Sequence, residues 1–240
     1  MIGIIGALDV EITVIKNLMT DVREETISKI NFYIGKISGQ DCVLAQCGVA
    51  KVNAAMCTQT MILMFKPEAI INTGVAGALN KEINIGDIVV SSSVVHHDAN
   101  IIEDEGKESG MLFPRGTIQF SDESITKIDA DKALADRLIE GCKNIDGVKV
   151  FYGTVASGEQ FISSKVARIE IGEFFNAYCC EMEGAAIGQV CYRNDVPFVI
   201  LRAISDTIDD NDFMDFEKFK CIAADETLKV IKAFFNVEEK

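Results

Sequence analysis

CEMEGAAIGQVCYRNDVPFVILRAISD, residues 180–206, predicts a helix followed by a buried strand, and this pair of elements decides the fold class. Small and apolar residues recur at helical spacing over residues 184–194, which gives the helix one buried stripe. Pro197 ends the helix because it lacks an N–H group and disfavours helical backbone at the residue before it. The nearly all-apolar run at 198–204 is typical of a strand that is covered on both faces, as in α/β proteins.

Carboxylates lie at both ends of this helix–strand pair. Glu181 and Glu183 stand where the helix begins, and Ser205 and Asp206 follow the strand. In α/β sheets, ligands bind in the crevice beyond the C-terminal ends of the strands. Carboxylates in this arrangement indicate acid–base chemistry or ligand binding rather than packing.

The same alternation of strand and helix patterns extends over the rest of the chain. Further strands are predicted at residues 2–5, 29–37, 41–47, 69–72, 87–95 and 149–156. Further helices are predicted after the first strand and at residues 51–65, 129–144, 164–175 and 213–235. No Pro-, Gly- or Ser-rich linker and no internal repeat interrupts the pattern. We therefore predict a single α/β domain over residues 1–240, with helices covering a central sheet.

The chain is acidic, with 37 Asp and Glu residues against 23 Lys and Arg residues and a net charge of −14. Nucleic acids and anionic membranes bind clustered Lys and Arg, so we predict neither as a partner. No apolar run approaches the ~20 residues that a transmembrane helix needs. The N-terminus also lacks the basic leader and apolar core of a signal peptide. A soluble, cytoplasmic protein is expected.

The cysteines and histidines do not have the spacing of a metal site. The chain has eight Cys but no CxxC motif, and its only two His residues, His96 and His97, are adjacent. Most of the cysteines lie inside apolar patterns, which favours reduced, buried thiols over a disulfide framework. We therefore expect no bound metal.

Eight short motifs occur in order along the chain. They are GIIGA at 3–7, CGVAKVNAA at 47–55, INTGVAGAL at 71–79, GDIVVSS at 86–92, HHDA at 96–99, SGEQFI at 157–162, CEMEGAAI at 180–187 and RAISD at 202–206. Together they closely resemble the bacterial-type 5′-methylthioadenosine/S-adenosylhomocysteine nucleosidases, within the wider nucleoside phosphorylase family. The resemblance implies a three-layer fold with a twisted mixed sheet flanked by helices, and a homodimer. It implies irreversible hydrolysis of an adenine N-glycosidic bond, with no metal or organic cofactor, in thioadenosine removal and methionine salvage.

Cleavage of an N-glycosidic bond needs a proton for the departing adenine, most usefully at N7, and a water to capture the oxocarbenium-like sugar. General acid–base help of this kind is worth ~10²–10⁴-fold. The resemblance implies that Asp206 is the acid, which must hold a proton when substrate is bound, and that Glu11 activates the water. From the residues alone, capping of a helix is an alternative role for Asp206, and interaction with the positive end of a helix dipole is the favoured role for Glu11.

The resemblance implies 5′-deoxyadenosine as a further substrate. It also implies which residues bind the nucleoside. Glu183 would accept hydrogen bonds from the ribose hydroxyls, and Met182 would form the floor beneath the sugar. Phe161 would stack on adenine, and the Ile162 backbone would read the purine edge. The remaining expected contacts are Ser205 with the base, Ala7, Val49 and Val75 along the pocket, and Phe216 on the alkylthio side.

Charge separates hydrolysis from phosphorolysis. Phosphorolytic relatives hold phosphate with arginines, notably in the loop after the first strand, whereas residues 6–11 here contain two acids and no basic residue. A phosphate beside Glu11 would meet like-charge repulsion, and a water needs such a base, so hydrolysis is favoured. Arg202 ends an apolar strand and requires a carboxylate partner if it is buried. The family pattern points to Glu11 as that partner.

Two departures from the family pattern leave the preferred substrate open. Val75 stands where the family commonly has Ser, which removes one hydrogen bond near the sugar or base. The loop at 103–108 reads EDEGKE in place of the aromatic, glycine-rich pattern that helps complete the neighbouring subunit's pocket. A futalosine-type nucleosidase, a phosphorolytic purine nucleoside phosphorylase and a non-catalytic nucleoside-binding or storage protein are the alternatives. Retention of Glu11, Glu183 and Asp206 together favours an enzyme over a storage protein.

Overall fold

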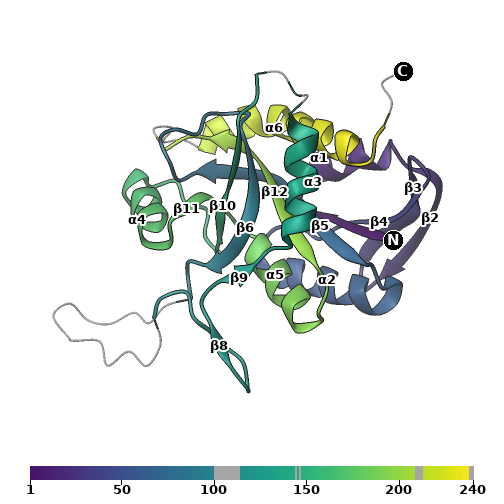
Figure 1. Ribbon diagram of the computed structural model, residues 1–240, viewed down its shortest axis with the longest axis horizontal. Coiled ribbons are helices and arrows are strands. Elements are labelled where there is room, and N and C mark those ends of the chain that lie inside the picture. The colour runs from purple at the N-terminus through teal and green to yellow at the C-terminus, as the bar shows by residue number, and fades with distance from the viewer. Residues whose placement is uncertain (100–113, 144, 146, 209–212, 238–240) are drawn as a thin grey trace.

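The computed structural model describes residues 1–99, 114–143, 145, 147–208 and 213–237 (Figure 1). The side chains of residues 213–218 and 220 are not described. The atypical loop at 103–108 therefore lies outside the described residues, and so does the side chain of Phe216.

The central sheet has ten strands in the order β11-β10-β6-β12-β5-β1-β4-β3-β2, with β9 paired to β6. These strands are β1 (Ile2–Gly6), β2 (Thr20–Ile27), β3 (Ile30–Ile37), β4 (Gln40–Gln46), β5 (Ala69–Ala78), β6 (Ile88–His96), β9 (Ile128–Asp129), β10 (Val150–Ser157), β11 (Ala177–Glu181) and β12 (Phe198–Asp206). β1 pairs in parallel with β4 and with β5, and β5 pairs in parallel with β12. β12 pairs antiparallel with β6, and the edge strands β2, β3 and β4 pair antiparallel with one another in that order. The predicted mixed sheet is confirmed. A separate two-stranded sheet pairs β7 (Ile118–Gln119) with β8 (Ser124–Ile125).

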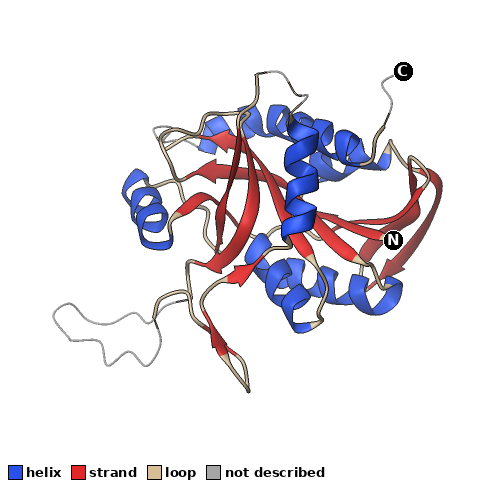
Figure 2. Ribbon diagram, viewed as in Figure 1, coloured by secondary structure: helices blue, strands red, loops and turns tan. Residues whose placement is uncertain are grey.

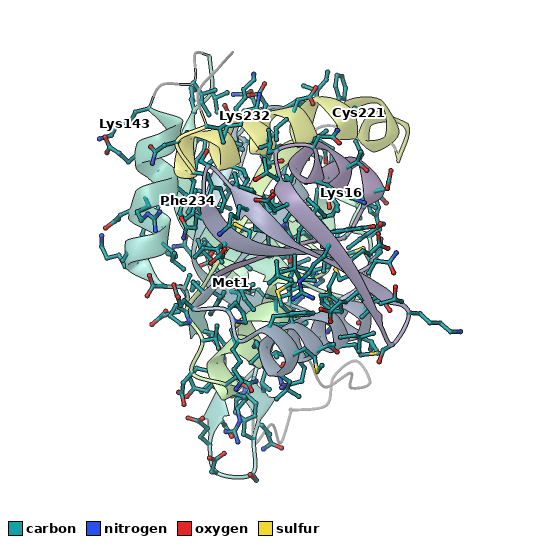
Figure 3. All side chains as sticks on the ribbon, turned by 90° about the vertical axis from the view of Figure 1, so that its right-hand side faces the viewer. Met1, Lys16, Lys143, Cys221, Lys232 and Phe234 are labelled. Atoms are coloured by element: carbon teal, nitrogen blue, oxygen red, sulfur yellow. The ribbon has the colours of Figure 1, made fainter. Side chains whose placement is uncertain are left out.

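Helices cover both faces of this sheet (Figure 2). They are α1 (Asp9–Lys16), α2 (Lys51–Phe65), α3 (Lys132–Cys142), α4 (Lys165–Phe175), α5 (Gly184–Arg193) and α6 (Phe213–Phe234). α6 contacts α1 and α3 on one face, and α2 packs with α5 on the other. Seen from the side, α6 with its labelled residues Cys221 and Phe234 lies on the same side of the sheet as Lys16 of α1 (Figure 3). The three-layer arrangement of helix, sheet and helix is the predicted one.

Buried apolar side chains fill the spaces between the layers. One cluster, which includes Met61 and Ile187, lies between the sheet and the α2–α5 layer. A second cluster, which includes Ile15, Leu138 and Ile231, lies between the sheet and the α1–α3–α6 layer. Because helices cover both faces, β12 is buried at every position, which explains its nearly continuous apolar sequence.

Three features of the sheet differ from the predicted pattern. β2 is a charged and mostly exposed edge strand, so it carries no apolar alternation that would reveal it. β11 was not predicted as a strand, and β5 continues to Ala78, beyond the predicted strand end at residue 72. β11 pairs in parallel with β10 and antiparallel with the end of β5, where Cys180 is opposite Gly77. As a result, β11, β10, β6, β12 and β5 form a closed ring of strands.

Other sequence predictions concern membranes, thiols and metals. Among the described residues, no helix combines the length and the apolar character that a membrane span requires. All eight cysteines are free, and of these only Cys221 on α6 is exposed. In the same described part of the chain, no group of three or more His, Cys, Asp or Glu side chains is arranged to hold a metal ion.

Candidate active site

A cavity of about 430 Å³ lies at the C-terminal ends of β1, β5, β11 and β12. The sequence-predicted residues that line it are Ala7, Glu11, Val49, Val75, Phe161, Ile162, Met182, Glu183, Ser205 and Asp206. The lining also includes Leu8, Ala76, Gly77, Gln160, Arg168 and Cys180, to which the sequence patterns gave no role, and Glu181, which they placed at the helix entrance without a specific role. The fold therefore brings together three carboxylates from distant segments, and Glu11, Glu183 and Asp206 are only 3%, 6% and 3% exposed.

The carboxylate of Glu11 is held by backbone N–H groups. Ala7 and Leu8 donate to its Oε2 at 2.8 and 2.9 Å, and Val75 donates to its Oε1 at 3.2 Å. Burial raises the pKa of Glu11, although these hydrogen bonds and the nearby Arg202 charge oppose the shift. The bond from Leu8 also caps the start of α1, so the structural and the functional interpretation of Glu11 are compatible.

Two glycines of β5 make room for the carboxylates. A Cβ atom on Gly74 would lie 2.8 Å from Oε1 of Glu11, and one on Gly77 would lie 2.8 Å from Oδ2 of Asp206. Both distances are shorter than normal van der Waals contact. The TGVAG segment is therefore glycine-rich because two acidic side chains pack directly against its backbone, not because it forms a loop.

Arg202 lies behind the cavity wall and does not pair with Glu11, which corrects the sequence-based prediction. Its guanidinium forms an ion pair with Glu181, donates to Oδ1 of Asn72 at 2.6 Å, and lies 3.7 Å from Oε2 of Glu183. Glu11 is already satisfied by its three backbone donors, whereas Glu181 is fully buried beside the arginine. A buried carboxylate that lacked such a partner would be strongly destabilising.

Glu181 organises the entrance to α5. Its Oε2 accepts hydrogen bonds from the backbone N–H groups of Glu183 and Gly184 at 3.0 and 2.8 Å, and its Oε1 accepts one from the Ser157 hydroxyl. Burial alone would raise the pKa of Glu181, but Arg202 and these donors outweigh it and lower the pKa. The sequence offered a signal for Glu181, namely a second acid two residues before Glu183.

Glu183 has fewer partners than Glu181. Its Oε1 accepts a hydrogen bond from the backbone N–H of Ala50 at 2.8 Å. Burial, reinforced by the negative charge of Glu181, raises the pKa of Glu183 to about 8. The two neighbouring carboxylates therefore differ in protonation at neutral pH, with the charge concentrated on Glu181.

Asp206 is the last residue of β12, and its carboxylate lines the cavity. Its Oδ1 accepts a hydrogen bond from the Ser205 hydroxyl at 2.7 Å, and its Oδ2 forms an ion pair with Arg168. α6 begins only at Phe213, so Asp206 does not cap that helix. Arg168 is a residue that sequence reasoning missed, because an arginine in the first turn of a predicted helix reads as a surface side chain.

Apolar side chains complete the cavity. Val75 and Met182 line its inside, and Phe161 and Val49 are 42% and 44% exposed at its edge. A mostly apolar cavity with a few convergent polar groups is typical of a site for a small organic ligand. Three buried carboxylates with different partners further suit this site to proton transfer.

Comparisons with known proteins identify relatives along the whole chain. The family model described as "Phosphorylase superfamily" matches residues 1–236. A 5′-methylthioadenosine/S-adenosylhomocysteine nucleosidase of Staphylococcus aureus (strain JH9) is 37% identical over 237 residues, which cover 98% of this chain and 99% of the relative.

Solved structures give the same result. A 5′-methylthioadenosine/S-adenosylhomocysteine nucleosidase from Neisseria meningitidis, in complex with methylthio-immucillin-A, superimposes with a TM-score of 0.88 at 31% identity over 97% of each chain. A futalosine hydrolase of Helicobacter pylori strain 26695 superimposes with a TM-score of 0.87 at 30% identity, over 98% of this chain and 97% of its own.

Proposed function

The chain belongs to the phosphorylase superfamily, and we propose that it hydrolyses the N-glycosidic bond of 5′-methylthioadenosine and S-adenosylhomocysteine, releasing adenine. The names of the similar proteins support this activity along nearly the full length of the chain. The observation that carries the proposal is the presence of three buried carboxylates, those of Glu11, Glu183 and Asp206, on one mostly apolar cavity.

Asp206 is proposed as the general acid. Adenine is a poor leaving group as an anion, so a proton must reach its ring nitrogen N7 as the bond to the sugar breaks. Asp206 lines the same cavity as Phe161 and Ile162, the proposed adenine-binding residues, and Arg168 bonds both to Asp206 and to the Ile162 carbonyl. In this role Phe161 stacks on the purine, the Ile162 backbone reads its edge, and Ser205 orients the acid.

Glu11 is proposed as the general base that activates the attacking water. Its three backbone hydrogen bonds fix the carboxylate in one position, and burial raises its affinity for a proton. Glu183 is proposed to accept hydrogen bonds from the ribose hydroxyls, with Met182 beneath the sugar. The negative charge of ionised Glu11 would also stabilise the cationic sugar of the transition state.

Charge favours water over phosphate as the nucleophile. Two arginines lie at the cavity or behind it, and each is already paired: Arg168 with Asp206, and Arg202 with Glu181. Glu11 and Glu183 add further acidic groups on the same wall. A phosphate entering this site would meet carboxylates and no uncommitted arginine among the described lining residues, whereas a water would meet a base.

We also propose that the protein is a homodimer, as the family resemblance implies. Val52, Met56 and Leu63 of α2 are exposed and fall on one face of the helix, at spacings of four and seven residues. This apolar stripe continues towards Val49 at the edge of the cavity, and such a surface marks protein interfaces. The single domain over 1–240, the cytoplasmic location and the role in methionine salvage stay predictions.

A mutation on the stripe tests the dimer. We expect Val52→Glu to convert a dimer into a monomer in size-exclusion chromatography with light scattering. Met64→Glu is the matched control, because Met64 is exposed on the same helix but on a different face. A wild-type monomer, or a Val52→Glu dimer, would contradict the proposal.

An assay of free adenine tests the activity. The protein is incubated with 5′-methylthioadenosine, with S-adenosylhomocysteine or with a futalosine-type nucleoside, each with and without phosphate. Release of adenine without phosphate supports the proposed hydrolysis, and a phosphate requirement supports a phosphorylase instead. Cleavage of the futalosine-type nucleoside alone would change the substrate, and tight binding without cleavage would support a storage protein.

A further inference from the structure

A buried arginine contacts the proposed general acid and has no part in the proposed chemistry so far. Arg168 lies in the first turn of α4 and is only 3% exposed, as is Asp206. One of its terminal nitrogens pairs with Oδ2 of Asp206, and the other donates to the backbone carbonyl of Thr207. Its Nε donates to the carbonyl of Ile162 at 2.8 Å. Arg168 thus joins β12 to the segment that is proposed to read the purine.

The two oxygens of Asp206 have unlike partners. Oδ2 packs against Gly77 and is held by the Arg168 guanidinium, which can donate protons in hydrogen bonds but cannot accept them. Among the described residues, Oδ1 has one hydrogen-bond donor, the Ser205 hydroxyl at 2.7 Å, and that hydroxyl has a second acceptor, the carbonyl of Ala76 at 3.3 Å. Ser205 can therefore turn towards Ala76 and free Oδ1, whereas Oδ2 stays bound to Arg168.

We propose that Arg168 is a positioning residue for the general acid: it fixes Oδ2 of Asp206, so that Oδ1 carries the proton to the base, and it stabilises the negative charge that Asp206 acquires. In this step the O–H bond at Oδ1 breaks, a new N–H bond forms on the purine, and the electron pair stays on the carboxylate. The guanidinium interacts more strongly with the carboxylate that forms than with the neutral acid. Such an interaction lowers the barrier to the step. The inference rests on the proposed function of Asp206.

The charged and titratable groups around this pair are few among the described residues. From α4 the facing group is Arg168 itself, and from β12 it is the uncharged Ser205. From β11, Cys180 faces the pair, and burial raises its pKa to about 12, so its thiol stays neutral in the range of the assay. From β5, the contact is made by the backbone of Gly77. Among the described side chains, Arg168 is therefore the charged group in direct contact with Asp206.

The test is the steady-state kinetics of adenine release by full-length variants. Arg168→Gln removes the charge that fixes Oδ2 of Asp206 and stabilises the carboxylate that forms. We expect kcat to fall about 10- to 100-fold with a smaller change in KM, because the interaction strengthens only as the proton leaves Asp206. Arg168→Lys keeps the charge but loses the fork geometry, so it should restore part of the lost kcat.

Two further variants separate a chemical role from a structural one. In an Asp206→Asn background, Arg168→Gln should cause no further loss of kcat, since Arg168 acts through Asp206. Arg193→Gln, at an exposed arginine paired with Asp122, should behave as wild type. A wild-type kcat in Arg168→Gln, a loss that appears in KM instead of kcat, or no recovery of kcat in Arg168→Lys would overturn the proposal. If the Gln variant does not fold, the Lys variant still decides it, because its loss of kcat should disappear in the Asp206→Asn background.

Release of adenine by the wild-type protein reports on the proposed function, whereas the kcat of the variants reports on Arg168. An active wild type with an unchanged kcat in Arg168→Gln would refute the role of Arg168 and leave the nucleosidase activity intact. An inactive wild type would refute both, because Arg168 is assigned to the same reaction.

Discussion

The two ends of the cavity hold their carboxylates in different ways. At the end proposed to bind the sugar and the water, Glu11, Glu181 and Glu183 share one arginine, Arg202, with which only Glu181 forms a close ion pair. At the end proposed to bind the base, Asp206 has an arginine of its own, Arg168. The first end has more acidic groups than basic ones, and the second is balanced.

This difference matches the charges that the proposed reaction would create. A cationic sugar is stabilised by surplus carboxylates. Burial raises the pKa of Glu11, and burial together with the charges of Glu181 and Glu11 raises the pKa of Glu183. An acid that must give up its proton is helped by an adjacent guanidinium. Carboxylates that line one cavity can therefore differ in their tendency to bind or release a proton, according to how many arginines lie beside each of them.

The largest expected effect comes from removing the acid at the balanced end. Asp206→Asn keeps the shape and the Ser205 hydrogen bond but cannot donate an acidic proton. We expect kcat for adenine release to fall towards the upper end of the ~10²–10⁴-fold range of general acid catalysis. Binding of 5′-methylthioadenosine, measured by calorimetry, should be retained. A variant with wild-type kcat would show that protonation of the base comes from elsewhere.

Glu11→Gln tests the end of the cavity that has more acidic groups than basic ones. The amide keeps an oxygen for the Ala7 and Leu8 donors but is not a base, so we expect a loss of about 10²-fold or more in kcat. The acid limb of the pH profile, which reports the ionisation of a base, should change as well. If Glu11→Gln released adenine at the wild-type rate, the assignment of the base would be wrong.

Two alanine substitutions compare the ends directly. Gly77→Ala would place a Cβ 2.8 Å from Asp206, and Gly74→Ala would place one 2.8 Å from Glu11, so each displaces one carboxylate. We expect roughly 10- to 100-fold losses in kcat/KM, in line with the cost of misplaced catalytic groups. Gly39→Asn is the control, since Gly39 is in an open hairpin turn with nothing near its Cβ position.

Double variants test whether each glycine acts through its carboxylate. Adding Asp206→Asn to Gly77→Ala should lower kcat/KM by a smaller factor than Asp206→Asn does alone. Adding Glu11→Gln to Gly74→Ala should likewise lower kcat/KM by a smaller factor than Glu11→Gln does alone. Fully additive losses would mean that the glycines act through the backbone and not through the carboxylates.

The smallest effect concerns stability. Burial raises the pKa of Glu183 from an ordinary value near 4.5 to about 8, so the folded protein holds a proton that the unfolded chain has lost between these pH values. Stability should therefore fall as pH rises from about 4.5 to 8, with a slope of at most about 1.4 kcal/mol per pH unit from this group. Urea unfolding at a series of pH values measures it. Glu183→Gln should flatten the slope, and an unchanged slope would contradict the assignment.

The sequence predicted the layered fold because its strongest patterns are those of burial. β12 is apolar because both of its faces are covered, and the amphipathic helices were found from their apolar stripes. β2 was missed since it is an exposed edge strand, and the end of β5 since its glycines resemble a loop. Those glycines make room for the side chains of Glu11 and Asp206, which lie far away in the sequence, so no local pattern contains that information.

The lining of the cavity was predicted through the family motifs, but the ion pairs within it were not. Glu11 was expected to form the ion pair with Arg202, whereas Glu181 forms it. Both carboxylates accept backbone hydrogen bonds, so the pairing depends on which of them lies beside the guanidinium once the chain has folded. Arg168 was missed altogether because its partner, Asp206, is 38 residues away along the chain. Ion pairs of this kind follow from tertiary distances, which local sequence spacing does not give.

The closed ring of strands has a consequence for amide exchange. Because β5 pairs with β12 along one edge and with β11 at its far end, the segment from Gly74 to Gly77 lies within a hydrogen-bonded ladder, and the Val75 N–H donates to Glu11. Such amides exchange with deuterium only through large-scale opening of the molecule. Slow exchange along this segment would mean that the floor of the cavity opens only when the whole ring does. A mutation that loosens the ring at any strand should then speed exchange beneath both carboxylates at once.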